Sequence, residues 1–156
     1  MSLPDLRPEP LTPESFAPFG RVIWDDPATA KEINAGFTTR YHALATAETD
    51  ADTVISLFRG RPRPLEIAML ERHPKGSQAF VPLGGADWLA VVAPEPDPAA
   101  LRLFRCRGVQ GLQYATGIWH HPLLVLGAEQ DFLVVDRAGP GGNLEETFFA
   151  PRHIAL

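Results

Sequence analysis

The stretch LERHPKGSQAFVPL, from Leu70 to Leu83, places charged, imidazole and amide side chains between apolar residues. Pro74 lacks a backbone N–H, and Gly76 adopts conformations that other residues avoid, so we expect one strand to end before this turn and another to begin after it. Polar groups at such a bend face either a cleft or solvent, and a solvated hairpin is the more common arrangement. A second polar cluster at residues 119–122, WHHP, also comes just before an apolar run, which favours the cleft.

Length and composition limit the class of protein. The chain has 156 residues, of which 45% are hydrophobic, and this predicts one domain spanning residues 1–156. Acidic residues outnumber basic residues by 19 to 14, for a net charge of -5. We therefore expect neither nucleic acid nor an anionic membrane as a partner. No apolar run approaches the roughly 20 residues that a membrane-spanning helix needs.

The N-terminal segment and the cysteine content bear on the compartment. Residues 1–10 are polar and proline-rich, without the apolar stretch of a secretory signal. Cys106 is the single cysteine, so no internal disulfide can form, and we expect a cytoplasmic location. Arg105 and Arg107 flank this thiol, but its position at the end of an apolar strand favours a packed, structural role.

Short β-prone runs separated by turn residues make up most of the chain. The 16 prolines and 13 glycines leave little room for long helices. One short helix is predicted over residues 11–16, because Thr12 suits the N-cap and Pro13 suits the first turn. Extended segments or strands are expected at 21–24, 33–44, 54–58, 65–72, 77–83, 88–93, 101–106, 112–116, 123–127, 132–136 and 144–149.

This arrangement of segments predicts the fold class. Residues 88–93 are apolar throughout and are expected to form a fully buried strand. Residues 123–127 and 132–136 are expected to pair as a hairpin. Many short strands at regular spacing, with turn signals between them, predict an all-β sandwich or barrel.

The adjacent histidines His120 and His121 are the first candidates for chemistry. Neighbouring strand residues point to opposite faces, so at most one of the pair faces the interior of a barrel. Trp119 shares the face of His121, and we take His121 as the inward residue and His120 as the outward one. For any single histidine, a structural role held by backbone hydrogen bonds is more common than catalysis.

Other charged groups have surface roles as their simplest interpretation. Arg59, Arg61 and Arg63 form a basic turn that we expect to be a solvated face. The pair Asp136–Arg137 ends a predicted strand, where a surface ion pair contributes little to stability.

A metal site needs a ligand set that the sequence supplies only in part. Metal-binding barrels of the cupin type carry the pattern H-x-H-x(3,4)-E and a further histidine on a later strand. Here the first cluster offers only His73 and Gln78, and the second offers His120 or His121. The amide oxygen of Gln78 is a weak ligand for a transition metal. We therefore expect no cofactor and no tightly bound metal, although a weakly bound divalent ion is compatible with the sequence.

Several segments, taken in order, resemble the ureidoglycolate lyase family, called ureidoglycolate hydrolase in older usage. They are Asn34-x-Gly36 with Arg40-Tyr41-His42, Glu71-Arg72-His73-Pro74, Gln78-Ala79-Phe80-Val81-Pro82, Trp119-His120-His121-Pro122-Leu123, and Asp131-Phe132 with Asp136-Arg137. The resemblance runs from about Phe16 to the last strand. It implies a cupin-like β-barrel (a double-stranded β-helix), commonly a homodimer, that splits ureidoglycolate into glyoxylate and urea late in allantoin breakdown.

The reaction implied by this resemblance assigns roles to the polar residues. Ureidoglycolate is a carbinolamine with a carboxylate, and its hydroxyl must lose a proton while the leaving urea nitrogen gains one. Arg72 is expected to hold the carboxylate through a bidentate fork, and His73 or His121 to act as general base. The expected catalytic residues are His73, His121 and Arg72, and the expected substrate-binding residues are Arg72, Gln78, Asn34, Tyr41, Trp119 and Lys75.

Two other functions stay open from the sequence. One is a cupin module that binds a small carboxylate without turning it over, although no DNA-binding segment accompanies it. The other is a metal-dependent cupin enzyme, which the missing H-x-H pattern disfavours. Release of ammonia in place of urea would need an activated water, often metal-bound, and the thin ligand set disfavours that outcome as well.

Overall fold

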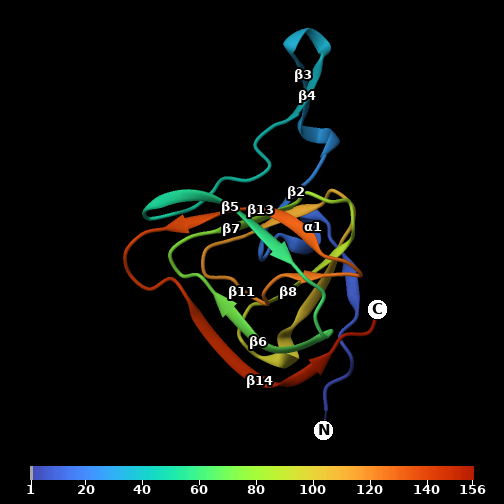
Figure 1. Ribbon diagram of the computed structural model, residues 1–156, viewed down its shortest axis with the longest axis vertical. Helices are drawn as coiled ribbons and strands as arrows, with labels where there is room; N and C mark the ends of the chain where they lie inside the picture. The colour runs from blue at the N-terminus through green and yellow to red at the C-terminus, as the bar shows by residue number, and fades with distance from the viewer. Residues whose placement is uncertain (1) are drawn as a thin grey trace.

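The computed structural model describes residues 2–156, which form two large β-sheets packed on each other and one small sheet that stands apart (Figure 1). None of the helices in these residues is long and apolar enough to cross a membrane. The helices are α1 (Pro13–Phe16) and the 3-10 helices η1 (Pro27–Thr29), η2 (Asn34–Gly36) and η3 (Pro98–Ala100). The strands are β1 (Pro8–Pro10), β2 (Gly20–Ile23), β3 (Ala30–Ile33), β4 (Thr38–Tyr41), β5 (Asp52–Gly60), β6 (Glu66–Arg72), β7 (Gln78–Pro82), β8 (Trp88–Ala93), β9 (Arg102–Cys106), β10 (Gly111–Tyr114), β11 (Trp119–His120), β12 (Leu124–Val125), β13 (Gln130–Ala138) and β14 (Glu145–His153).

Both large sheets join strands that are distant in sequence. The seven-stranded sheet has the order β1-β9-β8-β11-β6-β14, with β12 also paired to β8. The five-stranded sheet has the order β2-β10-β7-β13-β5. β1 runs parallel to β9, whereas the other pairs in the two sheets are antiparallel. The predicted all-β, cupin-like fold with one short α-helix is confirmed.

The turn between β6 and β7 carries the chain from one large sheet to the other. Gly76 is required in this turn, because a Cβ there would lie 2.9 Å from the Cβ of Arg137 and 3.0 Å from the carbonyl oxygen of Glu48. The next residue, Ser77, donates its N–H to the same Glu48 carbonyl at 2.9 Å. The predicted break between the two strands is therefore confirmed, and it is a crossing between sheets.

The core between the sheets is rich in aromatic side chains. Trp88 and Phe132 are 1% and 0% exposed and meet edge to face, with ring centroids 5.0 Å apart. Phe80 packs against both rings. All 6 residues of β8 are buried, as predicted. Alternate β8 residues belong to this core, whereas Leu89 and Val91 belong to a second apolar cluster on the other face of the strand.

Helix α1 begins as the sequence predicts. The Thr12 hydroxyl accepts a hydrogen bond from the Ser15 N–H at 3.0 Å, and the Ser15 hydroxyl accepts one from the Thr12 N–H at 3.1 Å. This reciprocal capping box satisfies two N–H groups that lack helical partners. Phe16 ends the helix fully buried, with its ring packed edge to face on Phe104 at 5.4 Å.

Residues 33–44 were expected to be extended, and the structure corrects this. β3 and β4 form an antiparallel hairpin, which we call the arm (residues 30–41), with η2 as its turn. Asn34, Ala35 and Gly36 have positive φ angles of 54°, 58° and 87°, and this left-handed turn reverses the chain. The sequence prediction used the preference of side chains for extended backbone, and that preference does not show where the chain turns back. The arm projects beyond the two large sheets at the top of Figure 1.

The predicted hairpin between 123–127 and 132–136 is wrong. β12 pairs with β8 in the seven-stranded sheet, whereas β13 pairs with β5 and β7 in the five-stranded sheet. Leu124 and Val125 are 0% and 2% exposed and pack into different apolar clusters. β12 is therefore buried on both faces. This burial favours its pairing with β8 over a hairpin with β13, the next strand in sequence. The short strands β1 and β11 were not predicted, because a segment of two or three residues is too short to show an alternating pattern.

Candidate active site

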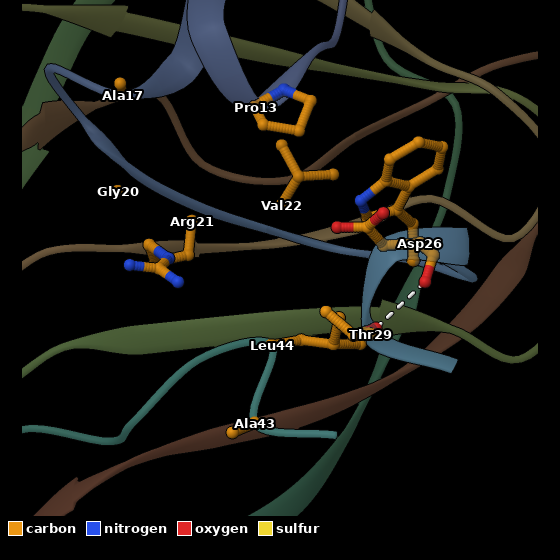
Figure 2. Close-up of a pocket in the computed structure, with 10 residues that line it drawn as sticks. Pro13, Ala17, Gly20, Arg21, Val22, Asp26, Thr29, Ala43 and Leu44 are labelled. Carbon is orange, nitrogen blue, oxygen red and sulfur yellow. Dashed lines mark hydrogen bonds between the residues drawn. The ribbon is translucent and has the colours of Figure 1, made fainter. Parts of the chain in front are cut away.

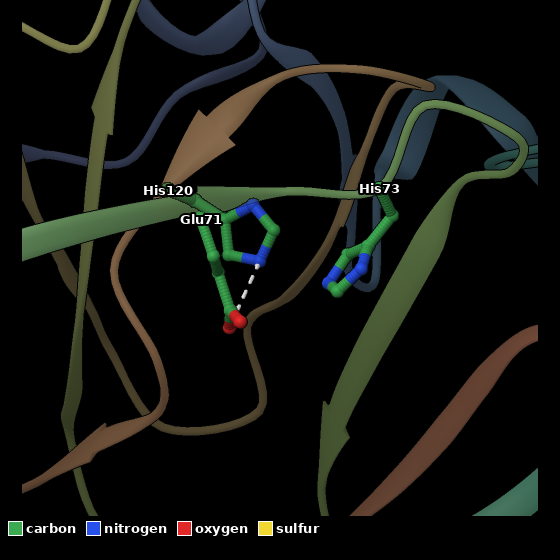
Figure 3. Close-up of side chains that lie close together, drawn as sticks. All are labelled: Glu71, His73 and His120. Atoms are coloured by element: carbon green, nitrogen blue, oxygen red, sulfur yellow. Dashed lines mark ion pairs between the residues drawn. The ribbon is translucent and has the colours of Figure 1, made fainter. Parts of the chain in front are cut away.

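Three ionisable side chains from two paired strands form the candidate active site (Figure 3). His120 of β11 lies opposite Glu71 of β6 in the antiparallel register, and residues opposite one another in such a pair project to the same face. His73 lies two residues beyond Glu71, which returns its side chain to that face. The carboxylate and both imidazole rings therefore converge.

The functional atoms of this cluster lie close together. Nε2 of His120 is 3.8 Å from a carboxylate oxygen of Glu71. One ring nitrogen of His73 joins them, so that all three atoms lie within 4.8 Å of one another. Tyr114 of β10 stacks on the His120 ring, with 4.2 Å between centroids and 11° between planes. This stack restricts the rotation of the His120 imidazole.

Backbone carbonyls select the tautomer of both histidines. Nδ1 of His73 lies 2.9 Å from the carbonyl oxygen of Asn143, and Nδ1 of His120 lies 2.9 Å from that of Ile118. A carbonyl oxygen only accepts, so each neutral ring carries its proton on Nδ1 and a lone pair on Nε2. Both Nε2 atoms are buried and have no hydrogen-bond partner among residues 2–156. These two buried nitrogen atoms are therefore free to accept hydrogen bonds from a ligand, or to bind one, beside the Glu71 carboxyl group.

Burial shifts the pKa of two members of the cluster, His120 and Glu71. It lowers the pKa of His120 from 6.5 to about 3, so this imidazole is neutral at physiological pH. Burial also raises the pKa of Glu71, a rise to which Glu146 adds and which the charge of His73 opposes. A raised pKa lets this carboxyl group hold its proton to higher pH and makes its ionised form a stronger base.

A cavity of about 360 Å³ opens beside this cluster, between the two large sheets. Its walls are aromatic, apolar, amide and arginine side chains together with Glu71 and His120. The amide of Gln78 donates to the Asp136 carboxylate at 3.1 Å, which orients it in the wall. The lining residues are Phe58, Arg59, Gly60, Arg61, Arg63, Glu71, Gln78, Phe80, His120, Pro122 and Leu123.

Three arginines at alternating positions line this cavity, and they differ in their partners. Arg59 makes a fork on Asp131, with N–O distances of 2.9 and 3.1 Å. Arg61 forms an ion pair with Glu129 at 3.2 Å. Arg63 forms no ion pair with any residue in the described part of the chain. Its guanidinium is therefore available to an anion. All three arginines are exposed, as predicted for a solvated turn, and they also line the cavity.

A divalent metal ion is one group that this cluster is able to hold. Two imidazole nitrogens and a carboxylate oxygen are common ligands for transition metals. Each histidine also donates its second ring N–H to a backbone carbonyl, as metal-ligating histidines usually do. The ligand set weighed from the sequence was His73, Gln78 and a histidine of the second cluster, whereas the structure assembles Glu71, His73 and His120.

A second hollow, of about 340 Å³, lies at the base of the arm (Figure 2). It is lined by α1, β2 and η1, and Thr29 there donates its hydroxyl proton to the backbone carbonyl of Asp26 at 2.9 Å. Its charged lining residues are Arg21 and Asp26, and no histidine is among the described residues around it. It lacks the two imidazole rings that meet a carboxyl group beside the first cavity, so we place the candidate active site at the first cavity.

Known proteins with similar sequences agree with the family resemblance seen in the sequence. The family model for ureidoglycolate lyase matches residues 3–155. The chain belongs to the ureidoglycolate lyase family. A ureidoglycolate lyase of Rhizobium etli is 52% identical over 152 residues, which cover 93% of this chain and 90% of the relative. One of Brucella anthropi is 52% identical over 149 residues, which cover 91% of this chain and 88% of the relative.

Among solved structures, a mutant of Bacillus subtilis oxalate decarboxylase is similar with a TM-score of 0.44 and 12% sequence identity. That match covers 63% of this chain and 24% of the other chain. Membership of the ureidoglycolate lyase family rests on the sequence matches, and it makes this protein an enzyme of the lyase class.

The structure brings some of the predicted site residues of this lyase together and separates others. His73 belongs to the cluster, and Gln78 lines the cavity beside it. Arg72 does not line the cavity; its guanidinium lies 4.8 Å above the Trp119 ring and forms an ion pair with Glu145 at 2.7 Å. Arg72 and Trp119 are strand neighbours of Glu71 and His120, so they project to the opposite face.

The remaining predicted residues lie farther from the cluster. His121 is buried and lines a different hollow, together with Pro64 and Met69. Its Nδ1 lies 2.8 Å from the Pro122 carbonyl oxygen, and it is His120 that meets His73. Asn34 and Tyr41 are exposed on the arm. Lys75 lies in the turn between β6 and β7, where its N–H donates to the Asn143 side chain at 2.8 Å.

Sequence reasoning missed three residues of the site. Glu71 and His73 form an E-x-H pair on one strand face, and this alternation was a usable signal. His120 and His121 are adjacent and point to opposite faces, and the sequence does not say which of them faces the site. Only the pairing of His120 with Glu71 of β6 identifies it. Arg63 follows Arg59 and Arg61 at alternating positions, which places all three on one side of an extended segment.

We predict that acid destabilises this lyase in part through His121. Burial lowers the pKa of His121 from 6.5 to about 4, so the unfolded chain binds a proton that the native chain rejects. This contribution to stability is complete above pH 6.5 and is lost as the pH falls toward 4, by about 2 kcal/mol between pH 8 and pH 5. Urea unfolding at those two pH values should show a smaller difference for His121→Asn than for the wild type. His153→Asn is the control, since that side chain is 67% exposed, and an unchanged pH dependence in His121→Asn would contradict the prediction.

Proposed function

We propose that this protein splits ureidoglycolate into glyoxylate and urea. Its family and its relatives named ureidoglycolate lyase support this reaction. The observation that carries the chemistry is the cluster itself: two buried, unpartnered Nε2 atoms face a carboxyl group of raised pKa beside a cavity. These groups supply the proton acceptor and proton donor that the collapse of a carbinolamine requires.

The reaction breaks one carbon–nitrogen bond and forms one carbonyl. In our proposal, Nε2 of His73 accepts the hydroxyl proton of ureidoglycolate while the hydroxyl oxygen forms the carbonyl of glyoxylate. The electron pair of the breaking bond stays on the ureido nitrogen, which takes a proton from the Glu71 carboxyl group and leaves as urea. Transfer of the proton from His73 back to Glu71 restores both groups for the next cycle.

His120 has a different part in this proposal. Because burial lowers its pKa to about 3, it stays neutral and accepts a hydrogen bond from an N–H group of the substrate. The stack with Tyr114 and the Ile118 carbonyl keep its Nε2 directed at the cavity. It thereby orients the ureido group for protonation.

Arg63 is the residue we propose as anchor of the substrate carboxylate. It lines the cavity and has no ion-pair partner in residues 2–156, whereas Arg59 and Arg61 are already neutralised by acidic residues. A guanidinium binds a carboxylate through two parallel hydrogen bonds. This assignment replaces the expected role of Arg72, whose guanidinium is held by Trp119 and Glu145 on the other face of β6.

A metal-assisted version of the same reaction is the second candidate, favoured by the ligand set of Glu71, His73 and His120. A divalent ion bound there would act as a Lewis acid toward the substrate oxygens. The three residues would then hold the ion, and Arg63 would keep its role at the carboxylate.

We predict that the purified protein forms urea and glyoxylate from ureidoglycolate and releases no ammonia in that step. Glu71→Gln and His73→Asn should each lower kcat by about 10²–10⁴-fold, because each removes a proton-transfer group. The control is His153→Asn, which alters an exposed histidine 3.8 Å from Glu66 and should leave kcat unchanged. Separate assays of urea and ammonia provide the measurement, and ammonia as the main product would refute the proposed reaction.

Chelation separates the two versions of this mechanism. Turnover that persists after exhaustive chelation supports proton transfer by the side chains alone. Loss of turnover that one added divalent metal restores, together with loss of metal binding in His120→Asn, supports the metal-assisted version. In either case the products of the wild-type reaction decide the overall function.

The choice of arginine leads to a separate prediction. Arg63→Lys should lower kcat/KM by about ten- to a hundredfold, because a point charge cannot make the bidentate fork. Arg72→Lys, the matched variant on the opposite face of β6, should change kcat/KM much less. Steady-state kinetics on both variants, with circular dichroism to confirm folding, test this. A silent Arg63→Lys beside a damaged Arg72→Lys would return the role to Arg72.

We also propose that the protein is a homodimer. β5 is an edge strand of the five-stranded sheet, and its residues Ile55 and Leu57 are 71% and 66% exposed. They lie opposite Val135 and Leu133 of β13, which are half-buried, so the apolar surface extends from the edge strand toward β13. Exposed edges and apolar patches of this kind favour a symmetric second copy.

Light scattering should therefore give the mass of a dimer at micromolar concentration. Ile55→Asp should shift the protein to monomer, because it places a charge in the proposed interface. Phe148→Asp is the matched control, since Phe148 is also 71% exposed but lies on β14 of the other large sheet. A wild-type monomer, or an Ile55→Asp protein that stays dimeric, contradicts this proposal.

A cytoplasmic location is proposed from the cysteine chemistry. Cys106 is buried and unpaired in the described chain, and burial raises the pKa of its thiol well above the ordinary value. A buried, protonated thiol is a poor nucleophile, so Cys106 is structural. A chain with one such cysteine is compatible with a reducing compartment.

A further inference from the structure

The loop between β13 and β14 contains a residue, Asn143, that holds the active-site turn by two hydrogen bonds. Nδ1 of His73 donates to the backbone carbonyl of Asn143 at 2.9 Å. The backbone N–H of Lys75 donates to the side-chain oxygen of Asn143 at 2.8 Å. These bonds lie on either side of Pro74, so one residue holds both ends of the short turn that carries His73.

We infer that Asn143 is a positioning residue that sets the tautomer and orientation of His73. This inference rests on the proposed function for the role of His73 as proton acceptor. The Asn143 carbonyl keeps the proton of the neutral ring on Nδ1, which leaves the lone pair on Nε2, directed at Glu71 and His120. The Asn143 side chain keeps that carbonyl in place through Lys75.

The two histidines of the cluster differ in where their holding carbonyl comes from. His120 is held by Ile118, two residues earlier on the same segment, so its tautomer is a local property of the chain. His73 is held by a residue 70 positions away in sequence. The tautomer of His73 therefore depends on the correct position of the β13–β14 loop, and a side-chain substitution can disturb it.

Contacts within the loop explain how a glycine-rich segment holds a fixed position. The Arg137 side chain is 3% exposed; it pairs with Asp50 and donates to the carbonyl oxygen of Pro140 in the middle of the loop. Gly141 has a φ of 83°, and a Cβ there would clash with the Lys75 ammonium group. Arg137 thus fixes the loop, and glycine lets it approach the turn that Asn143 holds.

Asn143→Ala removes the bond to Lys75 and tests this inference by two independent measurements. We expect kcat to fall about ten- to a hundredfold with little change in KM, as for other residues that orient a reacting group. We also expect the ¹⁵N NMR signals of the His73 ring, assigned by comparison with His73→Asn, to change from a single Nδ1–H tautomer to a mixture. Asn143→Asp keeps an acceptor oxygen toward Lys75 and should retain most of the kcat and the Nδ1–H tautomer.

Asp97→Ala is the matched control. Asp97 also accepts a backbone N–H, that of Ala99, at 2.8 Å, but in the loop between β8 and β9. If Asn143→Ala does not fold, Asn143→Ser takes its place, because its side chain is too short to reach Lys75. An unchanged His73 tautomer and kcat in the folded variant, or an Asn143→Asp protein as impaired as Asn143→Ala, would overturn the inference. The NMR result stands even if the wild type does not act on ureidoglycolate, so the two proposals fail separately.

Discussion

The crossing of the chain from β6 to β7 is the constraint on which the site depends. Gly76 passes so close to Arg137 and Glu48 that any side chain would force them apart. Because the chain changes sheet at this turn, Glu71 and His73 stay with the seven-stranded sheet while Gln78 enters the five-stranded sheet. The same turn therefore supplies polar groups to both walls of one cavity.

Burial between the sheets gives this cluster its chemical character. A histidine or carboxyl group in water would be fully hydrated, whereas His120 is 2% exposed and loses that solvation. The low local polarity disfavours both the imidazolium and the carboxylate, which explains the lowered pKa of His120 and the raised pKa of Glu71. His120 therefore stays neutral at physiological pH, and the Glu71 carboxyl group keeps its proton to a higher pH than it would in water.

The arginine side chains that line the cavity are a separate feature from the cluster of Glu71, His73 and His120. The chain carries a net charge of -5, yet three arginines line the cavity and two acidic residues, Glu129 and Asp131, pair with two of them. A local positive charge on an acidic protein attracts a small anion to this one place. In the proposed function, substrate binding and proton transfer therefore use adjacent but distinct groups of side chains.

The sequence by itself determined the fold class and the identity of the main polar stretches. Proline and glycine between short β-prone runs, and the Thr12–Ser15 cap of α1, are local signals, and the structure agrees with them. His73 and Gln78 were also found from the sequence, because both belong to the polar cluster between two apolar runs at residues 70–83.

Tertiary structure alone decided which residues meet. His120 and His121 are equivalent in sequence pattern, and only the register of β11 against Glu71 selects His120. β12 and β13 look like a hairpin, yet burial on both faces assigns them to different sheets. The carbonyl that holds His73 comes from Asn143, 70 residues along the chain. Such contacts arise from packing between distant segments, and local sequence preferences carry no record of them.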